Sequence, residues 1–321
     1  MYLLIIIYGY VLVAGLLIFF ILRDRRKHNL FFGQHRQLAI FCAAFLIIGI
    51  IIAFYSTLIE PIFLKTNRVE ITIKSFKSQL RIVFVSDIQI GPYKKEPWAK
   101  KIADRINSVN PDLVIFGGDQ IDNEATFEDE SRYLEPLRGL SLKYPVYYVV
   151  GNHESGIGGK VRFFPSYFTG DRTQLLIDRF DSFGFKLLRN SLDCPTIKNQ
   201  KICLFGIDDI WKKTPDFEEL ENRQASIPLI FISHNPDGIL YYPEEATPPD
   251  LVLAGHTHGG QVWLPFYGPL ASAQTTLGPE FYRGLNYFGN IPMFTSVGAG
   301  ESGAPLRLFV RPEIAVIKIL P

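Results

Sequence analysis

Two long apolar runs open the chain. Leu3 to Leu22 is twenty residues without a charge, and Leu38 to Ile59 is twenty-two more. At about 1.5 Å per residue, each run is long enough to cross a hydrocarbon core of roughly 30 Å. A cleaved signal peptide fits the first run poorly, because no basic residue precedes it and no small-residue cleavage site follows it. The pattern predicts a membrane anchor over residues 1–60, built as a transmembrane helical hairpin with spans at about 3–22 and 38–59.

The segment between the two apolar runs is basic. It holds Arg23, Arg25, Arg26 and Lys27, with Arg36 close behind. Positive charge favours a cytoplasmic turn, which places the rest of the chain on the other side of the membrane. Several basic residues also follow the second run: Lys65, Arg68, Lys74, Lys77 and Arg81. The charge bias is therefore weak, the side of the membrane stays open, and a hairpin that enters the bilayer without spanning it is the alternative.

From about Asn67 the pattern changes, and short apolar runs alternate with helical spacing. One helix is expected at Trp98 to Val109, where Asn110-Pro111 ends it. Strand-like runs lie at Leu80 to Val85, Asp112 to Phe116, Val146 to Val150, Lys201 to Phe205, Pro228 to Ile232, Asp250 to Ala254 and Gln261 to Leu264. Further strands are expected from Phe281 on, with a Gly-rich break at residues 297–300. The alternation predicts an α/β core over residues 67–321.

Polar residues with metal-binding side chains follow five of these strand-like runs. The segments are Ser86-Asp87-Ile88-Gln89, Gly117-Gly118-Asp119, Gly151-Asn152-His153-Glu154, Ser233-His234-Asn235 and Gly255-His256-Thr257-His258. Functional groups of open α/β sheets gather at the carboxyl ends of the strands. A lone histidine is more often a satisfied surface or core residue. Here all four histidines outside the N-terminal region lie within the motifs, which favours a common site.

Carboxylates, an amide and imidazoles are what a pair of divalent metals needs to act on a phosphate. Two ions roughly 3.5–4 Å apart neutralise the phosphate and lower the pKa of a water towards about 7. Asp119 is the natural bridge between them, because its Gly-Gly-Asp turn allows backbone and metals to approach. If His256-Thr257-His258 is extended, its two imidazoles point alike and each serves a different metal.

Composition argues against a nucleic-acid-binding protein and against a disulfide-rich fold. Lys plus Arg is 33 against 32 for Asp plus Glu, so the chain lacks the basic excess of a nucleic-acid surface. Three cysteines do not make a disulfide framework. Cys194 and Cys203 stand nine positions apart, and we expect small buried hydrophobic residues rather than a bridge.

Across about Leu80 to His258 the order of motifs resembles the calcineurin-like metallophosphoesterases. The family pattern is D-x-H, G-D, G-N-H-E or G-N-H-D, H, and G-H-x-H. The resemblance implies a two-sheet α/β/β/α sandwich with helices on both sides. It implies one metal held by Asp87, Gln89, Asp119 and His258, and a second held by Asp119, Asn152, His234 and His256. His153 would not be a ligand, and would stabilise or protonate the leaving oxygen.

Gln89 departs from the pattern, since the family usually has histidine there. An amide oxygen binds hard cations but is a poorer donor to zinc or iron than imidazole. The expected cofactor is therefore two divalent ions with Mn²⁺ preferred, and Mg²⁺, Fe²⁺ and Zn²⁺ as alternatives. A weakened site is the competing interpretation.

Two stretches bear on the substrate. Gly156 to Arg172 combines four aromatic residues with Lys160, Arg162 and Arg172, as a core-packing loop or as a lid beside His153. Residues 281–288 are also rich in aromatics. Candidate phosphate contacts are Arg162 and Arg307. Arg307 lies in a segment (296–307) that resembles the C-terminal signature of the membrane-anchored bacterial branch, and structural pairing is an equal alternative for it.

That branch includes phosphoesterases of unknown substrate and enzymes that split UDP-2,3-diacylglucosamine in lipid A synthesis. The leading hypothesis is a multi-pass inner-membrane hydrolase of a lipid-linked phosphoester or pyrophosphate, with the bilayer as partner. Its rivals are a membrane phosphodiesterase of other substrate and a catalytically weakened metal-binding protein. A nuclease is disfavoured, because tethering to a bilayer does not suit a polymer substrate.

Overall fold

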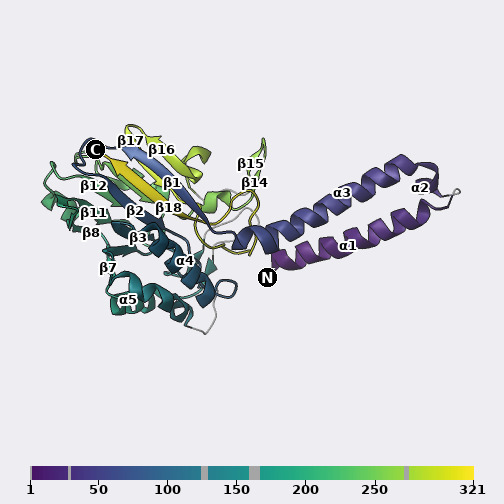
Figure 1. Cartoon of the computed structure of the whole chain (residues 1–321), viewed down its shortest axis with the longest axis horizontal. Coiled ribbons are helices and arrows are strands. Elements are labelled where there is room, and N and C mark those ends of the chain that lie inside the picture. Colours follow the sequence, from purple (N-terminus) through teal and green to yellow (C-terminus); the bar gives the residue numbers. More distant parts are fainter. Residues whose placement is uncertain (1, 28–29, 124–128, 159–166, 271–274) are drawn as a thin grey trace.

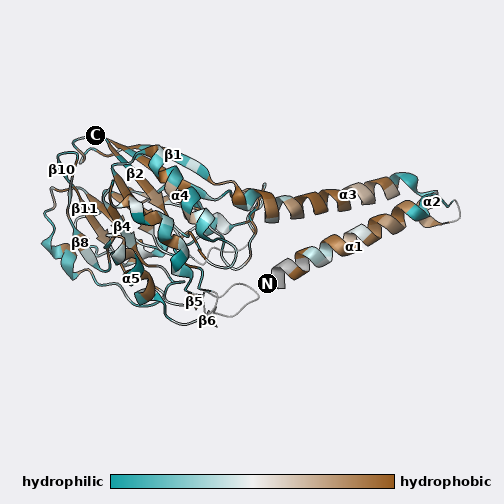
Figure 2. Ribbon diagram, turned by 60° about the horizontal axis from the view of Figure 1, so that its bottom comes forward, coloured by the Kyte–Doolittle hydropathy of each residue, from teal (hydrophilic) through white to brown (hydrophobic). Residues whose placement is uncertain are grey.

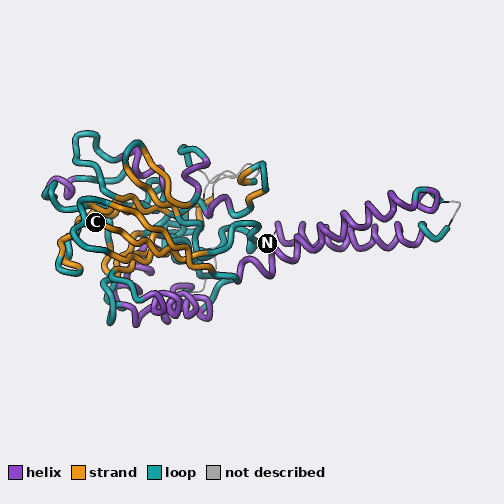
Figure 3. The backbone as a smooth tube through the Cα atoms, turned by 45° about the horizontal axis from the view of Figure 1, so that its top comes forward, coloured by secondary structure: helices purple, strands orange, loops and turns teal. Residues whose placement is uncertain are grey.

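The computed structural model describes residues 2–27, 30–123, 129–158, 167–270 and 275–321 (Figure 1). A helical hairpin projects from a body made of two sheets, and in Figure 3 its purple helices stand clear of the orange strands. The hairpin comprises α1 (Tyr2–Asp24), α2 (Phe31–Gln34) and α3 (Arg36–Phe54). A π-helical turn (Tyr55–Ile59) and a 3-10 turn (Glu60–Ile62) follow.

Two helices of the described chain are long and apolar enough to cross a membrane, over Ile7–Asp24 and Arg36–Ile62. Figure 2 shows hydrophobic brown along α3 and much of α1, and hydrophilic teal around α2. Small residues let the two helices approach, since Ala39 and Ala43 are buried together with Ile21. The apolar runs therefore form the predicted hairpin.

Two six-stranded sheets form the body. The first has the order β1 (Lys65–Thr72), β18 (Glu313–Leu320), β2 (Leu80–Val85), β3 (Leu113–Gly117), β4 (Val146–Val149) and β7 (Lys186–Leu187). The second has the order β16 (Gly284–Phe288), β17 (Ile291–Thr295), β13 (Leu251–Ala254), β12 (Leu229–Ile232), β11 (Cys203–Gly206) and β8 (Ser191–Asp193). Short pairs complete the set: β5 (Ile157–Gly158) with β6 (Tyr167–Phe168), β9 (Thr196–Ile197) with β10 (Gln200–Lys201), and β14 (Trp263–Leu264) with β15 (Gly268–Pro269).

The sheets pack face to face through apolar side chains that alternate along the strands. Phe84 of the first sheet meets Phe294 of the second edge to face, with ring centroids 6.5 Å apart. Helices α4 (Glu96–Val109) and α5 (Thr173–Ser182), with a 3-10 helix at Glu130–Leu140, cover the outer face of the first sheet. Short 3-10 turns at Glu218–Asn222 and Pro236–Tyr241 cover the second. This is the expected two-sheet α/β sandwich.

The predicted helix and most of the predicted strands are confirmed, although the strand expected at Gln261 to Leu264 is reduced to Trp263–Leu264. α4 buries Trp98, Ile102, Ile106 and Val109, and it ends where Asn110 takes a left-handed φ of 50° before proline. β2 occupies the predicted residues, and a long loop over 296–312 separates β17 from β18. The edge strand β1 was not expected, because six of its eight side chains are polar and it pairs with the distant β18.

Strand directions fix which end of the body faces the hairpin. β1 begins three residues after the 3-10 turn that closes the hairpin and runs away from it. β18 is parallel to β1, and β2 is antiparallel to β18, so β2 runs back toward the hairpin. β3 and β4 are parallel to β2. The carboxyl ends of β2, β3 and β4 therefore lie at the hairpin end of the body (Figure 1).

Hydrogen bonds fasten the hairpin to that end. The backbone N–H of Arg307 donates to the Ser56 carbonyl (2.8 Å), and that of Phe309 donates to the buried Glu60 carboxylate (2.9 Å). Lys94 Nζ donates to the Pro61 carbonyl (2.6 Å). The helical hairpin is therefore joined to the body by specific hydrogen bonds as well as by the chain itself.

One expectation about the cysteines is wrong. Cys194 and Cys203 form a disulfide. The cause is the antiparallel pairing of β8 with β11, which sets Asp193 opposite Leu204 and brings the two thiols together. Spacing along the chain could not reveal this cross-strand register.

Candidate metal centre

The predicted motifs converge from both sheets. Asp87, Asp119 and Asn152 follow β2, β3 and β4 of the first sheet, whereas His234 and His256 follow β12 and β13 of the second. The chain turns sharply at these ends. Asp87, Gln89, Asp119, His256 and His258 all have left-handed backbones, with φ between 48° and 68°. Such backbone conformations are costly for residues other than glycine, and they cluster at functional sites.

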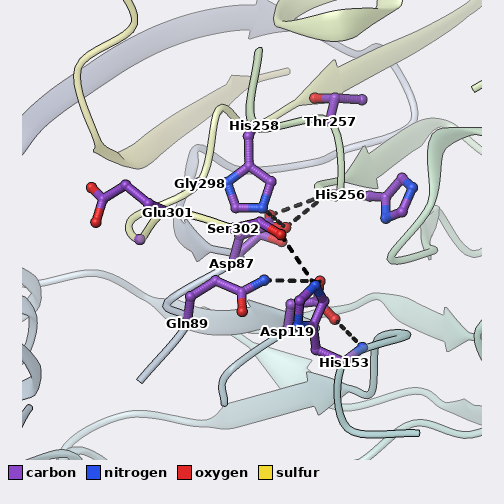
Figure 4. Close-up of polar contacts among 12 residues, drawn as sticks. Asp87, Gln89, Asp119, His153, His256, Thr257, His258, Gly298, Glu301 and Ser302 are labelled. Atoms are coloured by element: carbon purple, nitrogen blue, oxygen red, sulfur yellow. Dashed lines mark hydrogen bonds and ion pairs between the residues drawn. The ribbon is translucent and has the colours of Figure 1, made fainter. Parts of the chain in front are cut away.

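Asp119 stands at the centre (Figure 4). Its Oδ2 atom lies 3.0 Å from His234 Nε2 and accepts a hydrogen bond from Gln89 Nε2 at 3.1 Å. Its Oδ1 atom accepts the backbone N–H of His153 at 2.9 Å. Both oxygens thus face groups brought by other strand ends, as a bridging carboxylate requires.

The remaining candidate ligands form two groups around this centre. On one side, Asp87 Oδ1 lies 3.4 Å from His258 Nε2, and the backbone N–H of His256 donates to both Asp87 oxygens (3.1 and 3.0 Å). On the other, Asn152 Oδ1 lies 3.0 Å from His256 Nδ1. His234 and His256 pack ring against ring with centroids 5.2 Å apart. The predicted ligands therefore lie together.

The His256-Thr257-His258 segment is not extended, which corrects the expectation from the sequence. His256 and His258 have φ values of 68° and 48°, and His258 begins a 3-10 turn. The left-handed backbone, rather than strand alternation, directs the two imidazoles to different sides. His256 points toward Asn152, and His258 points toward Asp87.

Close packing and one buried carboxylate hold the Asp119 loop in place. Gly118 has a φ of 92°, and a Cβ there would lie 2.5 Å from His234 Nδ1, so only glycine fits. Glu154 is fully buried and accepts the backbone N–H groups of Asp119, Gln120, Ile121 and Gly151. The glutamate of the Gly-Asn-His-Glu motif thus clamps two strand ends together.

The protonation preferences of the histidines differ. Burial, with the charge of His234, lowers the pKa of His256 to about 3. Burial and the Arg307 guanidinium hold the pKa of His258 well below its ordinary value. Both imidazoles are therefore neutral, which is the form that binds metal. Burial also opposes the charged form of His153, but Asp119 and Asp122 outweigh it and raise the pKa of His153.

The donor set fits divalent cations. Asp119, His234 and His256 offer ligand atoms that all lie within 4.8 Å of one another. Among the residues described, the buried atoms without a hydrogen-bond partner include Gln89 Oε1, His234 Nε2 and His256 Nε2. Orphaned buried polar atoms cost roughly 1–3 kcal/mol each. Cations at this position would satisfy them, and His234 Nε2 lies 3.0 Å from Asp119 Oδ2.

Residues 80–260 match the family model of the calcineurin-like phosphoesterases. The chain belongs to this family. Membership of this family indicates a hydrolase that uses divalent metal ions. The resemblance seen in the sequence is confirmed.

Curated relatives support the assignment. The uncharacterized metallophosphoesterase YkuE of Bacillus subtilis is 30% identical over 80% of this chain and 87% of its own length. The phosphodiesterase YaeI of Escherichia coli is 29% identical over 77% of this chain and 84% of its own. The UDP-2,3-diacylglucosamine pyrophosphatase LpxG of Chlamydia muridarum is 28% identical over 82% of this chain and 91% of its own length. Other bacterial relatives are longer, and the chain spans 63–66% of their length.

The structure bears on only one of the two candidate phosphate contacts, Arg307, and gives it a structural role. Arg307 is fully buried, and its guanidinium donates to the carbonyls of Val297, Gly300 and Val310. It lies 3.4 Å from His258 Nδ1, so it supports a candidate ligand and does not reach solvent. Arg162 lies outside the described residues, as does most of the aromatic stretch around it.

Sequence reasoning missed three residues beside the centre. Asp209 is buried behind β11 with Oδ2 unpartnered, and burial raises its pKa to about 6. Trp211 packs edge-on against His256 with centroids 4.5 Å apart. Ser302 Oγ lies 3.3 Å from His153 Nε2. Asp209 had the same sequence signal as the other motifs, an acid after a strand-like run. Trp211 had none, and Ser302 was marked only by its place in the segment 296–307.

Proposed function

We propose that the chain is a membrane-anchored, metal-dependent phosphoesterase that cleaves a phosphoester or pyrophosphate bond in a lipid-linked substrate. The observation that carries the proposal is the convergence of carboxylate, amide and imidazole groups on Asp119 from five strand ends in two sheets. Membership of the calcineurin-like phosphoesterases supports the reaction type.

The ligand assignment follows the two groups of side chains. One cation would be held by Asp87, Gln89, Asp119 and His258, and the other by Asp119, Asn152, His234 and His256. When bound, the two cations supply positive charge to the phosphate and acidify the attacking water. Mn²⁺ suits a set in which one imidazole is replaced by the Gln89 amide.

His153 is the proposed proton donor to the leaving oxygen. Its Nδ1 atom lies 2.6 Å from the Asp122 carbonyl oxygen, a contact that orients the ring. Nε2 then faces the centre, 4.0 Å from Asp119 Oδ2. The raised pKa favours the protonated ring, which is the state that a general acid needs.

The place of the site supports a substrate that resides in the bilayer. The carboxyl ends of β2, β3 and β4 lie at the hairpin end of the body, so the candidate centre faces the membrane that the hairpin would enter. A phosphate carried on a lipid would be presented to this end, whereas the opposite end of the sheets points away from it.

Two features favour the non-cytoplasmic side of a bacterial inner membrane. The turn between the two spans is basic, and the Cys194–Cys203 disulfide belongs to an oxidising compartment. A lipid phosphodiester or pyrophosphate exposed on that side is therefore the first candidate. UDP-2,3-diacylglucosamine is the second, because of the similarity to LpxG, and it would require the cytoplasmic side.

The test is activity and metal content of the full chain in detergent with Mn²⁺. We expect hydrolysis of bis(p-nitrophenyl) phosphate and of a lipid phosphodiester. A separate assay with UDP-2,3-diacylglucosamine measures whether UMP is released. Asp119→Ala should lose both bound metal and activity. Asp104→Ala, which removes an exposed carboxylate on α4, is the matched control and should retain both.

Two results would overturn the proposal. Turnover that survives in Asp119→Ala would refute the mechanism. One Mn²⁺ or none per chain at saturation, without hydrolysis, would favour the metal-binding rival. Protease added outside intact spheroplasts decides the side, since only an outward-facing body would be cleaved.

A further inference from the structure

An exposed apolar rim lies at the end of the body that the helical hairpin joins. Its members are large side chains that the fold leaves in solvent: Phe63, Phe266, Tyr267, Leu270 and Phe309. Phe266 and Tyr267 form the tip of the β14–β15 hairpin, and Phe266 is fully exposed. Soluble surfaces carry such residues singly, whereas a group of them marks an interaction surface.

Short hydrogen-bonded links hold the rim at the level of the hairpin's end. The Trp263 backbone N–H donates to the Leu308 carbonyl (2.9 Å), which attaches β14 to the C-terminal segment. The next residue, Phe309, donates its N–H to Glu60 at the foot of the second apolar helix (2.9 Å). Figure 1 shows β14 and β15 at the same end of the body as that foot. The rim therefore continues the surface from which the helices leave.

The backbone gives independent evidence that these aromatics serve something other than folding. Phe266 has a φ of 66° and Phe309 a φ of 59°. A bulky side chain in the left-handed region is strained, and glycine or asparagine is the usual choice. Both residues also leave their rings in solvent. Turn geometry and core packing both disfavour phenylalanine here, so an external partner explains its presence.

Cations flank the rim as they flank membrane interfaces. The Arg283 guanidinium lies 3.8 Å from the centre of the Trp263 ring at the base of the β14–β15 hairpin. Arg311 lies 5.6 Å from the Phe63 ring and donates to the Phe63 carbonyl (3.3 Å). Aromatic rings with nearby arginines are typical of the headgroup layer, where rings sit among lipids and cations meet phosphates.

The rim is also joined to the candidate centre. β14 begins five residues after His258, and Gln261 between them donates from Nε2 to the carbonyls of Ser302 and Ala304 (3.2 and 3.0 Å). Ser302 in turn contacts His153. The rim and the proposed proton donor therefore belong to one end of the body.

We infer that the rim is a second membrane contact, in which the β14–β15 tip enters the lipid interface and sets the candidate centre against the headgroup layer. The inference rests on the proposed anchorage of the hairpin in a bilayer. Interfacial segments of this kind insert by roughly 5–10 Å. One junction alone would leave the body free to tilt, whereas a second contact holds the mouth of the site toward a phosphoester in the same leaflet.

Depth-dependent quenching tests the contact without any need for activity. The full chain is reconstituted into phosphatidylcholine vesicles with or without bromine on the acyl chains, and Phe266→Trp is compared with Leu142→Trp. Leu142 is an exposed apolar residue that precedes β4, at the end of the body away from the hairpin. After subtraction of the wild-type emission, Phe266→Trp should shift to the blue and lose emission in brominated vesicles, and Leu142→Trp should do neither.

Equal quenching at the two positions would overturn the inference. A blue shift without quenching, together with a higher mass of the particle, would assign the rim to a second copy of the chain instead. Either result is obtained even if the chain hydrolyses nothing, so failure of this inference is separable from failure of the proposed function.

A second comparison tests the consequence for catalysis. Phe266→Ser with Tyr267→Ser should lower kcat/KM on a phosphodiester lipid in vesicles by roughly tenfold, which corresponds to about 1.4 kcal/mol. Hydrolysis of soluble bis(p-nitrophenyl) phosphate should be unchanged, as should both activities in Leu142→Ser. Equal losses on both substrates would contradict a membrane role for the rim.

Discussion

Gln89 donates a hydrogen bond from its amide nitrogen to the central carboxylate of Asp119 at 3.1 Å, and its amide oxygen is buried without a partner. An amide oxygen is a hard and neutral donor. The first metal position should therefore favour Mn²⁺ or Mg²⁺ over Zn²⁺. Gln89→His should raise affinity for Zn²⁺ at this position, by roughly the 10–100-fold that changes near metal ligands produce.

Metal titrations followed by calorimetry check this expectation. Gln224→His is the control, because Gln224 is exposed in the loop before β12 and lies at the opposite end of that strand from His234. Unchanged Zn²⁺ affinity in Gln89→His, with Mn²⁺ affinity intact, would show that residue 89 is not a ligand.

Glu154 should be essential for the fold of the site. Its carboxylate accepts four backbone N–H groups from the loops after β3 and β4. Glu154→Gln replaces one acceptor by an N–H₂ group that faces donors, so buried amides lose their partners. We expect a loss of about 3 kcal/mol or more in the free energy of unfolding. Chemical denaturation measures it, with the exposed Glu135→Gln as control. A change as small as that of the control would contradict the clamp.

The metal motifs could be predicted because each is local. An apolar run indicates a strand, and the polar residues after it mark the end of that strand. Parallel strands bring such ends together at one edge of a sheet. Asp87, Asp119 and His256 were identifiable for this reason. Asp209 follows β11 in the same way and was overlooked, although its signal was present in the sequence.

What the sequence could not show depends on contacts between distant residues. The sequence left Arg307 open between a phosphate contact and a structural pairing, and only the fold decides, because the last loop places it in the interior beside His258. The disulfide follows from the register of β8 on β11. The orientation of the site toward the hairpin follows from the pairing of β1 with β18, which are more than 240 residues apart. The periodicity of hydrophobic residues along the chain does not indicate which distant segments pair.

His153 should matter in proportion to how much help the leaving group needs. A general acid contributes about 10²–10⁴-fold when the departing oxygen is basic. His153→Gln should therefore lose activity by that factor on an alkyl phosphodiester but only slightly on p-nitrophenyl esters, whose leaving group departs without a proton. Rates across a series of leaving groups check this. A uniform loss across the series, or loss of bound metal, would assign His153 a structural or ligand role instead.

Lys94 should make stability depend on pH at the junction between hairpin and body. Burial lowers the pKa of Lys94 to about 8, although Glu301 at 3.5 Å opposes the shift; Arg307 and Lys101 also act to lower it. Because the folded pKa lies below the unfolded value of 10.5, the unfolded chain binds more protons between about pH 8 and 10.5. The stability of the wild type should therefore rise through this window, by roughly 3 kcal/mol relative to a chain without the amine.

Melting curves of the wild type and Lys94→Met from pH 7 to 10.5 measure the difference, with the exposed Lys100→Met as control. Curves that stay parallel across this window would show that Lys94 is solvated in the folded protein and that the junction does not bury it.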